Sequence, residues 1–307
     1  MKCEDILFCF LLIVYNGYGQ EFGYDGTVGP SYWGRKFQSC AYGKLQSPID
    51  IEENNVTVVK FPPLVLENFD SSLKSVTLLN NGHTVQLSIE KDVIPMVHGG
   101  PLKGIYRFAQ LHFHWGKTDS EGSENLINNH SFPLELHMVF YSIDYGTFEA
   151  AANKTDGLTV LSFLYHKSDE ENPRYAKFEN KLLQVKRIGS TIGITDFGSL
   201  DNFTTTLRDT YFTYKGSLTT PPCSEVVIWI EFLKTIPLSH SQLQEFRLLT
   251  NQEGRMDHNF RPIQPLYDRV VYLNSPQVSS SSKVELCVAT SIFLLLLKVC
   301  TFTLTDI

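Results

Sequence analysis

Two histidines stand one residue apart in a stretch that is typical of a β-strand, and a third follows in a second such stretch. His112 and His114 lie in residues 109–115, and His137 lies in residues 135–139. Both runs are apolar or aromatic with few breakers, which favours strands. Alternate residues of a strand point to the same face, so His112 and His114 share a face. His137 could face them from a neighbouring strand. The pattern therefore predicts a sheet on which three imidazoles converge.

Three neutral imidazoles are the ligand set of a catalytic Zn²⁺ site, which leaves one corner of a tetrahedron open. A single His-x-His pair is more often an ordinary polar feature of a strand. Two neighbours strengthen the metal interpretation: Gln110 lies on the strand face of His112, and Glu135 lies beside His137. Each could hold the second ring nitrogen of a ligand and fix its tautomer. Spacing alone leaves both interpretations open.

The 307 residues suffice for one large domain or two small ones, and residues 20–273 contain no linker or repeat. Strand-like runs occupy residues 75–79, 84–89, 106–115, 134–141, 158–165 and 226–233. Several are continuously apolar, which is typical of strands covered on both faces in the middle of a large sheet. Helical patterns are fewer, at 174–183 after a proline and at 239–249 after a possible cap. We therefore expect a single, mainly β domain with a few peripheral helices.

The amino-terminal segment has the pattern of a signal peptide. Residues 1–19 contain Lys2, then an apolar stretch, and they end in small-x-small at 17–19. The apolar stretch is too short to favour a membrane span. This pattern predicts entry into the secretory pathway.

The carboxyl-terminal segment has the pattern of a signal for a glycosylphosphatidylinositol (GPI) anchor. A Ser-rich segment at 274–282 offers Ser279, Ser280 and Ser281 as attachment sites, and a hydrophobic propeptide follows at 283–307. A membrane span is the alternative, but Lys298 interrupts the tail and no basic segment follows it. The expected location is the extracellular face of the plasma membrane, with a secreted form as a further outcome.

The cysteines follow the same division. Four of them lie in the two end segments, and Cys40 and Cys223 remain between. Two cysteines in a secreted domain favour one disulfide, and two free buried thiols are the alternative.

The charge pattern argues against one class of partner, and the sequons agree with a secreted chain. The formal net charge is −7, with no basic block, which argues against binding to nucleic acid. Four Asn-x-Ser/Thr sequons predict surface glycans, at Asn55, Asn129, Asn153 and Asn202.

Seven ordered motifs resemble those of the α-class carbonic anhydrases, from about Gly23 to Leu266. They read QSPIDI at 46–51, NNGH at 80–83, QLHFHWG at 110–116, GSE at 122–124, ELH at 135–137, GSLTTPP at 216–222 and NFRP at 259–262. The resemblance implies a large, mostly antiparallel twisted sheet of about ten strands with the site in a conical cleft. Together with the anchor signal, it points to the GPI-anchored branch of the family.

The resemblance also implies roles for individual residues. His112, His114 and His137 would hold Zn²⁺, with Gln110, Glu135 and the backbone carbonyl of Asn259 as their outer partners. Thr219 would orient a zinc hydroxide nucleophile by donating to Glu124, and His83 would be the proton shuttle. The residues that order the connecting waters would be Tyr24, Asn81, Gln86 and Thr220. The apolar pocket for carbon dioxide would be lined by Val139, Val160, Leu218, Val227 and Trp229. Cys40 and Cys223 match the disulfide of extracellular members.

The implied activity is reversible, zinc-dependent hydration of carbon dioxide to bicarbonate and a proton, with sulfonamides and anions as inhibitors. A non-catalytic binding module on the same fold is one alternative, although such relatives lose zinc ligands. A zinc esterase is another. One departure is Asn125, where many members have a histidine. This departure puts local packing in doubt more than activity.

Overall fold

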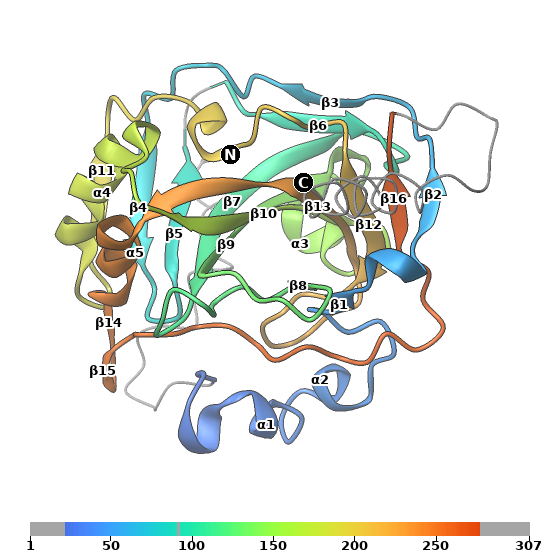
Figure 1. Cartoon of the computed structure of the whole chain (residues 1–307), viewed down its shortest axis with the longest axis horizontal. Coiled ribbons are helices and arrows are strands. Elements are labelled where there is room, and N and C mark those ends of the chain that lie inside the picture. The colour runs from blue at the N-terminus through green and yellow to red at the C-terminus, as the bar shows by residue number, and fades with distance from the viewer. Residues whose placement is uncertain (1–21, 91–92, 277–307) are drawn as a thin grey trace, which may run out of the picture. The chain divides into compact units, whose positions relative to one another are not determined.

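A large twisted β-sheet organises the computed structural model, which describes residues 22–90 and 93–276 (Figure 1). The described residues up to Ser275 belong to one compact unit. The strands are β1 (Asp50–Ile51), β2 (Thr57–Val59), β3 (Leu64–Glu67), β4 (Val76–Asn80), β5 (Val85–Ile89), β6 (Met96–Gly99), β7 (Tyr106–Trp115), β8 (Leu126–Ile127), β9 (Leu134–Ser142), β10 (Leu158–Ser168), β11 (Thr191–Ile194), β12 (Tyr211–Gly216), β13 (Val227–Ser239), β14 (Thr250–Asn251), β15 (Gly254–Arg255) and β16 (Tyr272–Asn274).

Within the described residues, twelve of these strands form the main sheet, which confirms the predicted fold class. The order is β11-β4-β5-β7-β9-β10-β13-β12-β16-β2, with β3 paired to β6 and β6 paired to β7. The sheet is mixed rather than purely antiparallel, because β10 pairs in parallel with β13, and β16 pairs in parallel with β2. Long excursions of the chain separate both parallel pairs, as parallel pairing requires.

The central strands are buried on both faces, as their continuous apolar runs predict. Nearly every residue of β9 and most of β10 are buried. One face packs against an aromatic cluster in which Phe113 of β7 meets Phe178 and Phe246 at ring-centroid distances of 5.3 and 5.0 Å. The other face carries Val139, Val160 and Trp229. Alternation along β7 therefore places Phe113 in the core and its two histidine neighbours on the opposite face.

Short helices cover the sheet and its ends. Helices α4 (Ala176–Leu182) and α5 (His240–Arg247) confirm the two predicted helices, and they contact each other beside β4 and β11 (Figure 1). Ser239 caps α5 in a capping box with Gln242. The other α-helices are α1 (Pro30–Trp33), α2 (Gln38–Tyr42) and α3 (Phe148–Ala151). In the part of the chain that the structure describes, the helices lack the length and apolar character needed to cross a membrane.

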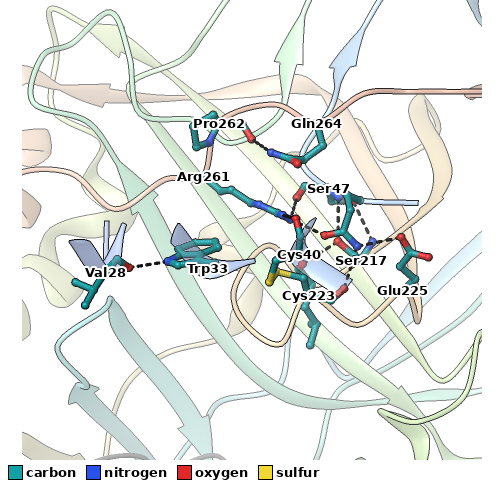
Figure 2. Close-up of a disulfide and its surroundings, with 12 residues drawn as sticks. Val28, Trp33, Cys40, Ser47, Ser217, Cys223, Glu225, Arg261, Pro262 and Gln264 are labelled. Carbon is teal, nitrogen blue, oxygen red and sulfur yellow. Dashed lines mark hydrogen bonds between the residues drawn. A yellow bond between two sulfur atoms is a disulfide. The ribbon is translucent and has the colours of Figure 1, made fainter. Parts of the chain in front are cut away.

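A disulfide joins α2 to the loop that follows β12. Cys40 and Cys223 are bonded with their Cα atoms 5.1 Å apart. Figure 2 shows Arg261 beside this bond, where its guanidinium donates to Ser47 O at 2.7 Å and to Cys40 O at 3.2 Å. In the same view Trp33 Nε1 donates to Val28 O at 2.9 Å. The amino-terminal segment is therefore tied covalently and by hydrogen bonds to the body of the domain.

Removing the disulfide should destabilise the fold strongly. The cysteines are 183 residues apart, and the chain-entropy model assigns a loop of that size on the order of 5 kcal/mol. We expect the Cys40→Ser/Cys223→Ser variant to lose about that much free energy of unfolding in urea titrations. The single variant Cys40→Ser is the control and should lose a similar amount. An unchanged urea midpoint in both variants would contradict this account.

Candidate metal centre

The pairing of β7 with β9 brings the three histidines together. His112 lies directly opposite His137 in the antiparallel register, and His114 follows on the same face of β7. The ring centroid of His112 lies 5.0 Å from that of His114 and 5.3 Å from that of His137, and the centroids of His114 and His137 lie 4.6 Å apart. His114 and His137 are each only 1% exposed. The sequence-based placement of all three on one face is confirmed.

Each histidine is held through one ring nitrogen by a different partner. His112 Nδ1 lies 2.9 Å from Gln110 Oε1, His114 Nδ1 lies 2.8 Å from the backbone O of Asn259, and His137 Nε2 lies 2.7 Å from Glu135 Oε1. Carbonyl and carboxylate oxygens only accept hydrogen bonds, so each of these nitrogens is the donor. The opposite nitrogens, Nε2 of His112 and His114 and Nδ1 of His137, are therefore the ones with a lone pair.

These lone-pair nitrogens suit a Zn²⁺ ion. A ligand nitrogen from each histidine lies within 4.8 Å of the others. Burial lowers the pKa of His114 to about 4, and burial together with the two neighbouring imidazoles lowers that of His112. Both rings are therefore neutral at pH 7, as metal ligation requires. Among the described residues, His114 Nε2 is buried without a hydrogen-bond partner, which an ion at this point would supply. Three neutral nitrogens leave a fourth position open on zinc.

Glu124 lies beside this cluster and is bound to Thr219. Glu124 Oε1 accepts from the backbone N–H of Arg261 at 2.8 Å, and its Oε2 lies 3.3 Å from His114 Nε2. Burial raises the pKa of Glu124 to about 7, while His137 and hydrogen bonds from the Thr219 side chain and the Arg261 backbone act in the opposite direction. A nearby dication would favour the carboxylate further. Thr219 and Glu124, far apart in sequence, thus act as one unit next to the metal position.

An apolar pocket opens next to two of the histidines. Its lining comprises Gln110, His112, His137, Val139, Phe148, Val160, Leu218, Thr219, Thr220 and Trp229. The structure therefore brings together four of the five predicted pocket residues. Val227 is buried in the same apolar cluster but is not part of the lining that the described residues form. Phe148, the first residue of α3, lines the pocket and was missed, because a lone aromatic in a short helix gives no pattern in the sequence.

His83 lies at the end of a turn organised by Asn81. The side-chain oxygen of Asn81 accepts from the backbone N–H groups of His83 and Thr84, both at 2.9 Å. The His83 ring stacks on Phe22 with centroids 4.0 Å apart and an interplanar angle of 9°. Burial lowers the pKa of His83 to about 4. Phe22 was missed by the sequence analysis, since it is distant from His83 in sequence and belongs to no motif.

The other two residues predicted to order waters lie near the same site. Gln86 of β5 is paired with His112 of β7. Burial, and after it the charge of Glu124, raises the pKa of Tyr24 well above its usual value. Tyr24 therefore keeps its proton and remains a hydrogen-bond donor beside Glu124.

Asn125 stands where the resemblance leads us to expect a histidine, and it is well packed at this position. It is fully buried, and its Oδ1 accepts from Tyr214 Oη at 2.9 Å and from the backbone N–H of Ile49 at 3.2 Å. Its Nδ2 donates to Glu135 Oε1 at 2.9 Å. The amide thus supports the partner of His137 directly.

Comparisons with known proteins agree with this geometry. A family model described as eukaryotic-type carbonic anhydrase matches residues 28–275. A protein of Mus musculus named carbonic anhydrase 7 is 40% identical over 263 residues, which cover 83% of this chain and 95% of that protein. The protein of the same name from Homo sapiens is 39% identical over 263 residues, with the same coverage.

Replacing one ligand should remove the metal. We expect the wild-type protein to hold one zinc per chain and His114→Ala to lose it on dialysis against a chelator, because two imidazoles bind zinc far more weakly than three. The control is His240→Ala, since His240 is an exposed histidine on α5 that bonds Asp119 instead. Elemental analysis measures both. Full zinc retention in His114→Ala would show that the metal is bound elsewhere.

Proposed function

This chain belongs to the eukaryotic-type carbonic anhydrase family and is a zinc-dependent carbonate dehydratase, and we propose that it works at the outer surface of a cell with His83 as its proton shuttle. Carbon dioxide, water and bicarbonate are its substrates, and sulfonamides are inhibitors of such enzymes. The observation that supports the zinc-dependent activity is the set of three imidazoles, each fixed by a different partner and each with a nitrogen turned toward the others.

Zinc, when bound to the three histidines, supplies a water whose pKa is lowered to about 7, a value for which carbonic anhydrase is itself the reference case. Thr219 gives direction to that chemistry. Its hydroxyl proton is engaged by Glu124, so its lone pairs are left to accept a proton from a neighbouring group. The pocket of Val139, Val160 and Leu218 offers an apolar place for carbon dioxide beside the ligands. The chain's own residues thus orient the nucleophile and hold the substrate close to it.

His83 can move the released proton to solvent once its ring has left Phe22. In the stacked position its pKa of about 4 makes the imidazole a weak acceptor at neutral pH. Since burial is the cause of that low pKa, a ring turned toward water would return to about 6.5, where imidazole both accepts and releases a proton. We infer that the stacked ring is the resting position and that the exposed ring is the acceptor.

Two substitutions separate the chemical step from proton transfer. His83→Ala should lower kcat in weak buffer by about tenfold or more, with kcat/KM nearly unchanged, because proton transfer follows the hydration step. Added imidazole should restore much of the loss. Thr219→Ala should instead lower kcat/KM by on the order of 10²-fold, through lost orientation, and imidazole should not rescue it.

Stopped-flow assays of carbon dioxide hydration on the zinc-loaded protein measure both variants. Equal losses of kcat/KM in the two variants would refute the shuttle role of His83. Wild-type protein that binds zinc without hydrating carbon dioxide would favour a binding module instead.

Three features support an extracellular location. The predicted signal peptide, attachment serines and hydrophobic propeptide lie outside the described residues, so their support comes from sequence alone. The disulfide between Cys40 and Cys223 is typical of an oxidising compartment. The sequon residues Asn55, Asn129 and Asn153 are exposed and could carry glycans without disturbing the fold.

The fourth sequon is less accessible. Asn202 is only partly exposed, and Phe203 and Thr204 of the same sequon are buried. We therefore propose glycans at Asn55, Asn129 and Asn153 ahead of Asn202.

If a GPI anchor holds the protein at the cell surface, a phospholipase that cleaves the anchor should release it. Treating intact cells that express the chain with phosphatidylinositol-specific phospholipase should release active enzyme into the medium. As a control, a chain ending at Ser282, which lacks the hydrophobic tail, should be secreted without treatment. Resistance to the phospholipase, with a peptide from residues 283–307 recovered from the mature protein, would favour a membrane span.

A further inference from the structure

A third buried carboxyl group lies behind the metal centre, and the reaction described above does not use it. Glu231 is on β13, directly opposite Ser162 of β10 and Phe212 of β12, and it is 0% exposed. A glutamate is almost never fully buried without a charged partner. Within residues 22–90 and 93–276, Glu231 Oε1 has no hydrogen-bond partner. Burial of this kind is costly, so it calls for a physical reason.

Hydrogen bonds connect Glu231 to the partner of His137. Asn125 Nδ2 donates to Glu231 Oε2 at 3.1 Å and to Glu135 Oε1 at 2.9 Å, so one amide group joins the two carboxyls. Ser162 Oγ donates to Glu135 Oε1 at 2.7 Å and also interacts with the side chain of Glu231. Glu135 in turn is 2.7 Å from His137. Glu231 is therefore linked to a metal ligand through Asn125 and through Ser162.

The two carboxyls have unequal surroundings. Glu135 accepts hydrogen bonds from the backbone N–H groups of Glu124 and Asn125 and from the side chains of Asn125, His137 and Ser162. So many donors stabilise an anion, and Glu135 is the ionised member. Two neighbouring carboxylates in a dry interior cannot both be ionised. Burial, and next the charge of Glu135, raises the pKa of Glu231 well above its usual range.

A neutral Glu231 needs an acceptor for its own O–H, and Ser162 offers one. The hydroxyl of Ser162 gives its proton to Glu135, so its lone pairs remain to accept. A further titratable group beside this cluster is Tyr214 of β12, whose hydroxyl donates to Asn125 Oδ1, with Arg269 beyond it. A guanidinium accepts no hydrogen bond, and the Tyr214 hydroxyl bonds Asn125, whereas Ser162 lies directly opposite Glu231 in the sheet.

We propose that Glu231 is a positioning residue for the metal centre, which as a neutral acid donates to Ser162 and through it fixes Glu135 against His137. This inference rests on the zinc site of the proposed function and extends it by one further layer. Chains of hydrogen bonds strengthen one another in a low-dielectric interior, so the donation from Glu231 tightens the bond from Ser162 to Glu135. Keeping Glu231 neutral also avoids a second negative charge, which would offset the positive charge of the metal.

Zinc release from the whole protein tests this chain of contacts. In chelator competition, Glu231→Val should lose zinc about tenfold faster than the wild type. This is the lower end of the loss expected when a residue that supports a metal ligand is replaced. Glu231→Gln, which is neutral and keeps a donor and an acceptor, should stay within about twofold of the wild type. The matched control is Ile230→Ala, since Ile230 is equally buried on the opposite face of β13. It should lower the melting temperature without changing zinc release.

A double-mutant cycle tests the route through Ser162. Ser162→Ala should speed zinc release, and adding Glu231→Val to it should produce little further change, because both changes break one chain. If the effects of Ser162→Ala and Glu231→Val on the zinc-release rate instead multiply in the double variant, the route through Ser162 is wrong. The inference as a whole is overturned if Glu231→Val releases zinc at the wild-type rate, or if Glu231→Gln releases it as fast as Glu231→Val.

Infrared spectroscopy measures the protonation state directly and needs neither zinc nor activity. The difference spectrum of wild type minus Glu231→Gln at pH 8 should contain the carbonyl band of an un-ionised carboxylic acid. A carboxylate signal in its place would overturn the inference even if Glu231→Val failed to fold. A wild-type protein that binds no zinc would overturn the proposed function and this inference together. Normal zinc binding with a carboxylate signal would overturn the inference alone.

Discussion

The register of β7 against β9 is the constraint on which the rest of the site depends. With His112 opposite His137, the side-chain alternation of both strands brings the imidazoles to one face and sends Phe113 and Leu136 into the core on the other. A slip of one residue would reverse every side chain of β9 and bury the wrong set. The register is therefore enforced by the aromatic core behind it, since Phe113 packs between helices α4 and α5. Core packing and metal geometry are two results of the same pairing.

The second constraint is the cost of burying charge. Glu124, Glu135 and Glu231 are all buried within a small region behind the histidines. Each carboxyl offsets the cost of its burial differently. Glu135 accepts hydrogen bonds from several donors, Glu124 lies next to the metal position and to Arg261, and Glu231 carries a proton. Such a polar cluster stabilises little in itself, because desolvation offsets most of its attraction. What it contributes is orientation, since each group has few alternatives that satisfy its hydrogen bonds.

How far the sequence predicts the molecule depends on the range of the contacts involved. The central strands follow from their continuous apolar runs, the shared face of His112 and His114 follows from local alternation, and α5 follows from its cap at Ser239. The short outer strands β2, β3 and β16 were not predicted, because their partly exposed residues give no clear period. The parallel pairing of β10 with β13 is equally invisible to local patterns. Phe22, Phe148 and Glu231 were missed for a related reason, since each acts through partners that only the folded sheet brings near.

The disulfide belongs to the site as much as to the fold. Cys223 follows the loop that carries Thr219 and Thr220, and its backbone N–H donates to Thr220 O at 2.9 Å. Arg261 connects the same region to Glu124, because its guanidinium donates to Cys40 O while its backbone N–H donates to Glu124 Oε1. The covalent bond therefore holds the loop that carries Thr219, and the arginine holds Glu124. A pair drawn from such distant parts of the chain keeps its geometry only if both parts are anchored to a common body. The disulfide and the contacts of Arg261 together supply that anchor.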